Sequence, residues 1–143
     1  MATIRTAAAH WAGSLLEGSG EVALQSSGSG TFPVTWPSRA EESPGGRTSP
    51  EELIAAAHST CFSMALSHAL AQAGTPPTSI DTTASVTFVP GTGITGIALS
   101  VTGAVPGLDA AQFEEAAQTA KEDCPVSQAL RAVPLELEVH FSG

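Results

Sequence analysis

Apolar and polar residues alternate in several short segments of the chain, which is the pattern of strands that bury one face. Residues 81–89 and 94–105 alternate in this way on either side of Pro90-Gly91-Thr92-Gly93, which predicts a β-hairpin. Residues 135–141 (LELEVHF) predict a last strand. Shorter β-compatible segments flanked by Gly and Ser indicate further strands at 3–11, 21–25 and 31–36.

Residues 50–73 have the features of a long helix. Ser49 can cap its first turn, and the acidic pair Glu51 and Glu52 lies where negative charge favours the helix dipole. Gly74 marks its end. The middle of the segment is small and apolar on nearly every face, as in helices that are covered on several sides. We therefore expect a central helix packed against sheets or against another subunit.

Two more helices are predicted nearer the C-terminus, and a polar loop before the long helix. Asp109 can cap a helix that reaches about Asp123, and Pro125 opens a short one. Residues 37–50 are rich in Pro, Gly and polar residues, which favours a loop. The order of strands and helices predicts an α+β fold in one domain, residues 1–143.

Charge and composition narrow the classes of function. The chain has 5 Lys+Arg against 14 Asp+Glu, a net charge of -9, so we expect no nucleic acid and no anionic membrane as partner. The apolar run 53–70 is interrupted by His, Ser and Thr, and residues 1–13 lack the apolar core of a signal peptide. These features predict a cytoplasmic protein. In that compartment its two cysteines are expected to be free thiols or a catalytic couple.

The two cysteines lie in different local settings. Cys61 is about three turns into the long helix, where a free cysteine is usually a small core residue. Burial raises the pKa of a thiol, so a reactive Cys61 needs a nearby cation. Cys124 precedes Pro125 at a predicted helix N-cap, where the positive end of the helix can favour a thiolate. On local grounds either thiol can be the nucleophile, or both can be inert.

A metal site is the weaker interpretation of these residues. His58 and Cys61 share one helix face, which makes half a site, but the chain has no CxxC and no HExxH. We expect His58 to be a hydrogen-bonded core histidine. The other histidines, His10, His68 and His140, have no partner by spacing.

Three segments together resemble the OsmC/Ohr family. They are residues 49–66 (SPEELIAAAHSTCFSMAL), residues 77–83 (PTSIDTT) and Cys124-Pro125-Val126-Ser127. Val126 stands where the Ohr branch tends to have tyrosine, so the chain is more similar to the OsmC branch. The resemblance runs from about residue 10 to the C-terminus. It implies mostly antiparallel sheets that wrap long central helices in an intertwined homodimer.

The resemblance also implies roles for individual residues. Cys61 matches the peroxidatic cysteine and Cys124 the resolving cysteine, and Glu51 matches the catalytic glutamate. Arg39 is the best match to the catalytic arginine, with Arg47 as the rival. Glu51 and Cys61 are ten residues apart, or about 15 Å along a helix. If Glu51 serves the site, two such helices packed antiparallel would bring it close to Cys61 of the other subunit.

The activity that the resemblance implies is the reduction of hydroperoxides in oxidative and osmotic stress. Cys61 would become a sulfenic acid, Cys124 would close a disulfide with it, and an external dithiol of lipoyl type would restore both thiols, with no bound cofactor. The apolar surface around Phe62 and Met64 favours organic hydroperoxides over hydrogen peroxide. We expect Cys61 to be the buried thiol and Cys124 the more accessible one. The alternatives are a redox sensor without turnover and a structural or metal-binding domain.

Overall fold

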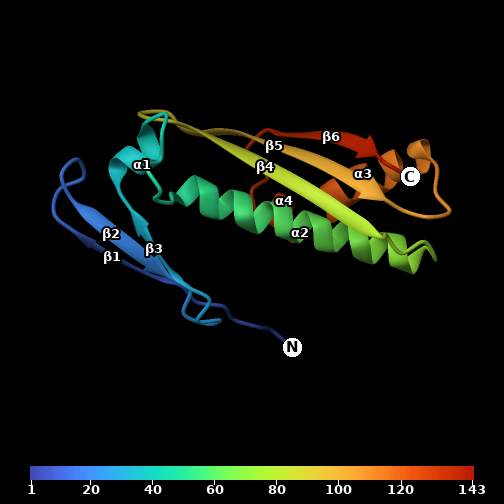
Figure 1. Cartoon of the computed structure of the whole chain (residues 1–143), viewed down its shortest axis with the longest axis horizontal. Helices are drawn as coiled ribbons and strands as arrows, with labels where there is room; N and C mark the ends of the chain where they lie inside the picture. The colour runs from blue at the N-terminus through green and yellow to red at the C-terminus, as the bar shows by residue number, and fades with distance from the viewer. The chain divides into compact units, whose positions relative to one another are not determined.

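The computed structural model describes all 143 residues, which form two compact units, Met1–Leu53 and Ile54–Gly143. The boundary between the units falls inside the long helix. The elements in chain order (Figure 1) are β1 (Ala8–Ala12), β2 (Ser19–Ala23), β3 (Thr31–Val34), α1 (Trp36–Ala40), α2 (Pro50–Gln72), β4 (Ser79–Val89), β5 (Gly93–Ala104), α3 (Ala110–Asp123), α4 (Pro125–Ala129) and β6 (Leu135–Phe141). The predicted α+β fold is confirmed.

The first unit contains an antiparallel sheet in the order β1-β2-β3. Every residue of β1 is exposed, and β2 and β3 are at most half-buried. None of the buried hydrophobic side chains of the chain lies in this unit, whose large apolar residues include the exposed Leu15 and Leu16. The first unit therefore has no apolar core of its own.

Helix α1 lies in the segment that was expected to be a loop, so the prediction of a continuous loop over 37–50 is wrong. Thr35 accepts a hydrogen bond from the backbone N–H of Ser38, and the Ser38 hydroxyl bonds back to the Thr35 backbone. Pro37 in the first turn favours the same start. This capping box begins one turn of helix within an otherwise turn-forming sequence.

The second unit contains the sheet β4-β5-β6. The predicted hairpin joins β4 to β5, and Gly91 in its turn has φ +83°, a conformation that favours glycine. Strand β6 runs parallel to β5, unlike the antiparallel pairing of the other strands. The parallel pairing follows from the connection, because α3 and α4 form the crossover that parallel neighbours need.

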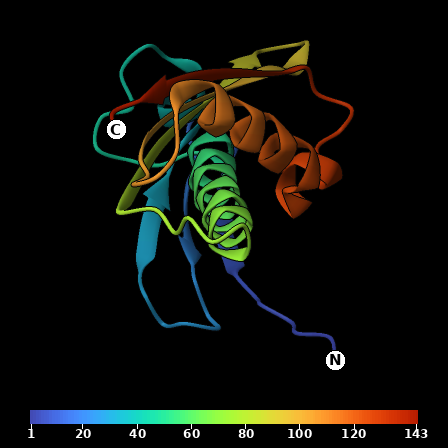
Figure 2. The same cartoon turned by 90° about the vertical axis from the view of Figure 1, so that its right-hand side faces the viewer.

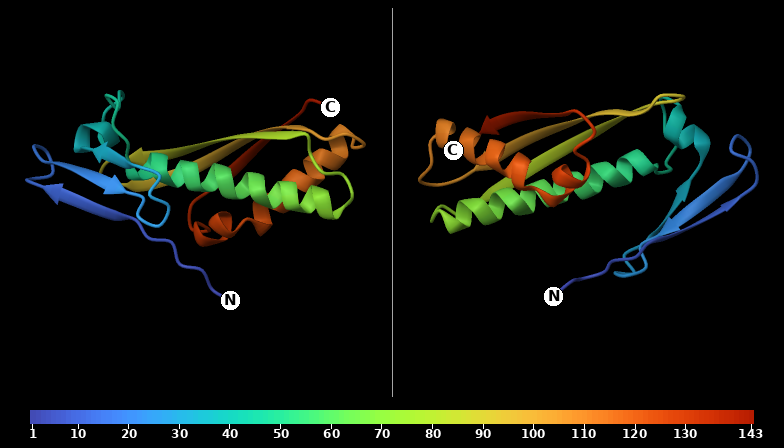
Figure 3. Two further views of the ribbon diagram at one scale, coloured as in Figure 1. Left: turned by 60° about the horizontal axis from the view of Figure 1, so that its bottom comes forward. Right: turned by 180° about the vertical axis from the view of Figure 1, so that it is seen from behind.

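The core of the second unit lies between this sheet and the helices. Alternate residues of β5 face inward, and Leu99 and Val101 are 2% and 0% exposed. They belong to one buried cluster with Phe62 and Leu66 of α2 and Phe113 of α3. Figure 2, which looks almost along α2, shows α3 and α4 beside it under the sheet, and the rear view in Figure 3 shows the same arrangement.

Helix α2 is buried on one side and exposed on another. Phe62, Leu66 and Leu70 are buried, whereas Met64 is 68% exposed and Ala57, Thr60 and His68 are also exposed. The expectation that the helix is covered on several sides is therefore not met within one chain. By length and composition alone α2 could cross a membrane, a test that the core helices of soluble proteins also pass.

Candidate functional site

Cys61 and Cys124 lie together in the core of the second unit, and both are free thiols. Cys61 comes from the middle of α2. Cys124 ends α3 and also begins α4, with φ −60° and ψ 120°. Pro125 after it disfavours helical backbone at Cys124, which accounts for the break between the two helices. The predicted N-cap position of Cys124 is confirmed, although its side chain makes no capping hydrogen bond.

The relative exposure of the two thiols is the reverse of the prediction. Cys124 is 0% exposed, whereas Cys61 is half-buried. The reason is that the α3–α4 break turns Cys124 inward onto the core cluster, while Cys61 lies toward the edge of the buried side of α2. In the second unit, Cys61 is therefore the thiol that solvent reaches first.

Burial raises the pKa of the Cys61 thiol above its usual value. A hydrogen bond from the backbone of Val126 lowers the pKa, and the neighbouring Cys124 thiol raises it, but burial is the largest influence. No cation is among these influences. The neighbours that Cys61 has in the second unit leave it a poor thiolate.

His58 joins α2 to α4 beside the cysteines. Its Nε2 lies 2.8 Å from Ser127 Oγ, and its side chain is fully buried. Burial lowers the pKa of the imidazole, since the charged form is disfavoured away from water. The expectation of a hydrogen-bonded core histidine is confirmed. Ser127 belongs to the Cys-Pro-Val-Ser motif, to which sequence reasoning assigned no role beyond the resemblance. Its place in the first turn of α4 is the signal that it could reach α2.

Arg39 and Glu51 form a two-pronged ion pair in the first unit. Arg39 Nη2 lies 2.9 Å and Nε 3.0 Å from Glu51 Oε1, and Nε lies 3.2 Å from Oε2. The Glu51 side chain is only 7% exposed, so the pair is largely shielded from water. Arg39 also lies 6.0 Å from the ring centre of Trp36. Arg47 is exposed and makes no ion pair.

The Arg39 side chain borders an apolar hollow of about 320 Å³ in the first unit. Its lining is formed by Trp11, Leu15, Val34, Thr35, Trp36, Arg39 and Pro50. Phe62, which was expected to offer apolar surface to a substrate, is instead 0% exposed in the core. Apart from Arg39, the residues around the hollow were not predicted from the sequence, because the fold brings them together from β1, the turn after it, β3, α1 and the start of α2.

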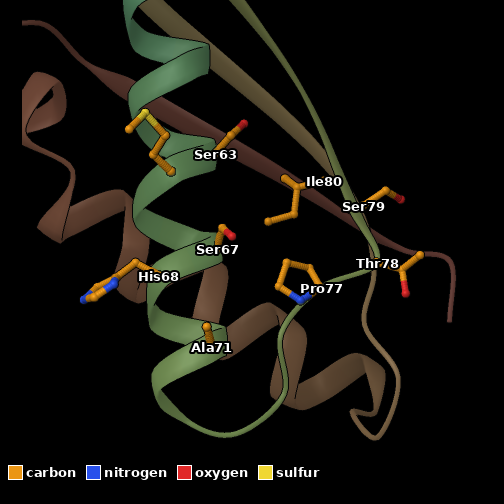
Figure 4. Close-up of a pocket in the computed structure, with 9 residues that line it drawn as sticks. Ser63, Ser67, His68, Ala71, Pro77, Thr78, Ser79 and Ile80 are labelled. Atoms are coloured by element: carbon orange, nitrogen blue, oxygen red, sulfur yellow. The ribbon is translucent and has the colours of Figure 1, made fainter.

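A larger groove of about 560 Å³ runs between α2 and the segment that leads into β4. Figure 4 shows Ser63, Ser67 and His68 on the helix side and Pro77 and Ile80 on the strand side. None of the predicted site residues lines it. The structure thus brings Cys61 and Cys124 together within the second unit and pairs Arg39 with Glu51 within the first.

Known proteins are similar to this chain in sequence. The family model "OsmC-like protein" matches residues 43–138. The chain is 50% identical over 127 residues, 87% of each sequence, to "Peroxiredoxin OsmC" of Escherichia coli (strain K12), and equally similar to the protein of that name from Shigella flexneri.

Solved structures with the same fold include two at about one quarter sequence identity. An organic hydroperoxide resistance protein from Elizabethkingia anophelis has 26% identity and a TM-score of 0.73, with 99% of this chain and 100% of that one covered. An organic hydroperoxide resistance protein OsmC from Legionella pneumophila has 25% identity and a TM-score of 0.71, with 97% and 99% covered. By its sequence and its fold, this chain belongs to the OsmC family.

Proposed function

We propose that this protein is a thiol-dependent peroxidase that reduces organic hydroperoxides, and hydrogen peroxide more weakly. The observation that carries the proposal is the placement of two free thiols side by side, one half-exposed and one buried. The names of the relatives, peroxiredoxin and organic hydroperoxide resistance protein, support the same activity.

The proposed cycle uses Cys61 for attack and Cys124 for resolution. The Cys61 thiolate attacks the terminal peroxide oxygen, the O–O bond breaks, and the alkoxide leaves as an alcohol after taking up a proton. Cys61 is then a sulfenic acid. The Cys124 sulfur attacks the Cys61 sulfur, the hydroxyl leaves as water, and a disulfide forms. Two exchange reactions with an external dithiol return both thiols and oxidise the dithiol to its own disulfide.

Arg39 is the cation that we propose activates Cys61. Its guanidinium, held in place by Glu51, would lower the pKa that burial raises. Glu51 and Cys61 are ten residues apart on one continuous helix, which corresponds to about 15 Å of rise. We therefore propose that the arginine paired with Glu51 activates Cys61 of a second subunit, whose α2 packs antiparallel to that of the first.

A homodimer also explains the apolar surface of the single chain. Six of the eight large exposed hydrophobic residues belong to the first unit, which has no apolar core of its own. Met64 is exposed on α2. Exposed apolar surface of this kind is typical of a face that another subunit covers. We propose that each chain, residues 1–143, acts as one domain of such a dimer.

The hollow beside Arg39 favours organic substrates in this proposal. Its walls include two tryptophans, and an alkyl or aryl tail placed there would lose contact with water. Hydrogen peroxide has no such tail and gains nothing from the hollow.

The reductant is proposed to be a dithiol of lipoyl type, with the reaction taking place in the cytoplasm. A faster return of the thiols with dihydrolipoamide than with glutathione would support that reductant, and the reverse order would exclude it.

Steady consumption of cumene hydroperoxide in the presence of dithiothreitol tests the proposed activity. The parent protein should turn over many times, Cys61→Ser should be inactive and form no sulfenate, and Cys124→Ser should form a sulfenate that persists. A single stoichiometric oxidation would instead support a redox sensor. The opposite behaviour of the two variants would exchange the roles of the cysteines.

A further inference from the structure

His58 and Ser127 form a hydrogen bond that the proposed chemistry does not use. The imidazole is fully buried, its Nε2 lies 2.8 Å from Ser127 Oγ, and its Nδ1 has no hydrogen-bond partner. A buried polar group with one nitrogen unpaired is less favourable than an apolar side chain of similar size. The hydrogen bond to Ser127 is the interaction at this position that an apolar side chain of similar size could not make.

The environment of His58 indicates the direction of the hydrogen bond. An N–H group buried without an acceptor is more costly than an unpaired lone pair, so the proton belongs on Nε2 and the lone pair on Nδ1. Burial lowers the pKa of His58 and keeps the ring neutral. The imidazole thus donates to the Ser127 hydroxyl, which accepts.

The two partners lie on the two segments that carry the cysteines. His58 is one helical turn before Cys61 on α2, and Ser127 is three residues after Cys124 in the first turn of α4. Between them, the backbone of Val126 makes the hydrogen bond to Cys61. A displacement of α4 from α2 would therefore move both the Val126 N–H and the Cys124 sulfur away from Cys61.

Helix α4 is anchored at its start, where Cys124 is fully buried and Val126 is half-buried against the core cluster, but the rest of the helix has few contacts of this kind. It is five residues long, buries no side chain and lacks a side-chain cap. Its other side-chain hydrogen bond runs from Gln128 to the Glu122 carbonyl, which belongs to α3 rather than α2. The bond from His58 is the one that links a side chain of α4 to α2.

We propose that His58 is a positioning residue for disulfide closure, acting through Ser127 to hold the Cys124 sulfur against Cys61. This role rests on the proposed function, in which the disulfide protects oxidised Cys61. The position of Cys124 relative to Cys61 can nevertheless be tested without peroxide. A disulfide requires the two sulfur atoms about 2.05 Å apart and a narrow range of torsion angles. A short helix that is free to shift would meet these requirements less often.

Ser127→Ala tests the positioning without any peroxide. The aromatic disulfide dithiobis(nitrobenzoate) reacts with Cys61, releases one thionitrobenzoate and leaves a mixed disulfide. Cys124 then attacks the Cys61 sulfur and releases the second thionitrobenzoate, at a rate independent of reagent concentration. We expect this second rate to fall about three- to tenfold, as the loss of one hydrogen bond allows, while the first rate changes little.

Thr82→Val is the matched control. It removes another hydroxyl that hydrogen-bonds to α2, the 2.7 Å contact between Thr82 and Ser63, at a position away from α4. The control should close the disulfide at the parent rate. A drop in the control equal to that in Ser127→Ala would overturn the proposal, because the effect would then be general loosening of α2.

A pair of substitutions at His58 separates positioning from packing. In His58→Gln the amide nitrogen can reach the place of Nε2, whereas in His58→Asn the side chain is too short. We expect Gln to restore most of the closure rate and Asn to leave it low. Equal rates in the two variants, or a Ser127→Ala protein that closes as fast as the parent, would contradict the role of His58.

The peroxide reaction gives the second measurement. With excess cumene hydroperoxide, slower closure should leave Cys61 longer as a sulfenic acid. At peroxide concentrations where the sulfinic fraction of the parent is small, that fraction, measured by mass spectrometry, should rise by the same three- to tenfold in Ser127→Ala. If the parent reduces no peroxide but closes its disulfide in a Ser127-dependent way, the proposed activity fails and the positioning stands. If the parent is a peroxidase and closure is insensitive to both residues, the positioning alone fails.

Discussion

The Cys61 thiol is subject to opposing influences from its neighbours. Burial and the Cys124 thiol raise its pKa, and the Val126 backbone lowers it. Together these neighbours raise the pKa of Cys61, so the thiol stays protonated near neutral pH. A guanidinium is the kind of group that reverses the balance, and Arg39 is the arginine that the structure pairs with Glu51.

Arg39→Ala should therefore slow the alkylation of Cys61. In a Cys124→Ser background, the midpoint of the pH profile for iodoacetamide should move up by about one to three units when the cation is removed. The matched control is Arg47→Ala, since Arg47 is exposed and makes no ion pair. A shifted midpoint in Arg47→Ala and an unchanged one in Arg39→Ala would give the role to Arg47.

His58 makes the stability of the fold depend on pH. Its pKa is lowered from 6.5 by burial, so below about pH 6.5 the unfolded chain binds a proton that the folded chain resists. This contribution of His58 to the free energy of unfolding is fully present above about pH 6.5. It is lost as the pH falls from there toward the lower pKa that His58 has in the folded protein. The slope that one proton can give is at most about 1.4 kcal/mol per pH unit.

Urea unfolding at pH 7.5 and pH 5.5, at one protein concentration and with thiols reduced, measures this dependence. The free energy of unfolding of the parent should be lower at pH 5.5, and His58→Gln should have a smaller difference between the two pH values. His10→Gln, which removes an exposed histidine, is the control. Equal pH dependence in the parent and His58→Gln would show that other groups are responsible.

At the scale of elements, β5 and α3 pack closely because Gly103 has no side chain. A Cβ at Gly103 would lie closer than 3.0 Å to the ring of Phe113, which is fully buried and lies 5.4 Å from the Phe141 ring between centroids. A ring held in this way cannot move aside freely. Gly96 on the same strand has open surroundings, since a Cβ there would lie 3.9 Å from the Pro134 carbonyl oxygen.

Gly103→Ala should destabilise the fold by about 1 to 3 kcal/mol through overpacking, measured by urea unfolding. Gly96→Ala on the same strand should change the free energy of unfolding by no more than about 0.5 kcal/mol. Equal effects at the two positions would mean that the loss of glycine in a strand, and not the contact with Phe113, sets the cost.

The elements that the sequence predicted well are those with long, regular patterns. The predicted helix at 50–73, the hairpin and the strand at 135–141 agree with α2, β4–β5 and β6. Each boundary differs by no more than two residues. The missed helix α1 is one turn long, and its capping box falls within a turn-forming segment. The exposure of the cysteines depends on tertiary packing, which local patterns do not contain.

The candidate site was predicted in parts. The motif around Cys61 and Cys124 pointed to a pair of thiols, and the structure places them together. Arg39 was preferred to Arg47 only by resemblance, whereas its ion pair with Glu51 depends on where α1 ends. The apolar hollow could not be predicted, because its residues come from segments that only the fold brings together.

At the scale of the whole molecule, the expected homodimer should be disrupted by a charge on the exposed side of α2. Met64 is 68% exposed in the single chain. Met64→Lys should shift the protein toward monomers in sedimentation velocity and lower its peroxidase activity, since a buried unpaired charge weakens an interface. Thr119→Lys, on the exposed surface of α3, is the control.

A fully active monomer of the parent protein would contradict the shared site. A Met64→Lys protein that stays dimeric and active would instead show that this part of α2 lies outside the interface. Loss of activity at concentrations where the parent dissociates, with recovery on concentration, would support a site that needs both subunits.

The parallel pairing of β6 with β5 affects the order in which the site is completed during synthesis. Cys124 lies in the crossover between these strands, so its final position requires a contact between strands far apart in sequence. Cys61 leaves the ribosome 63 residues before Cys124, which takes about 3 to 13 seconds at 5–20 residues per second. Each newly made chain therefore passes through a period in which its first thiol can be oxidised and no second thiol is present to protect it.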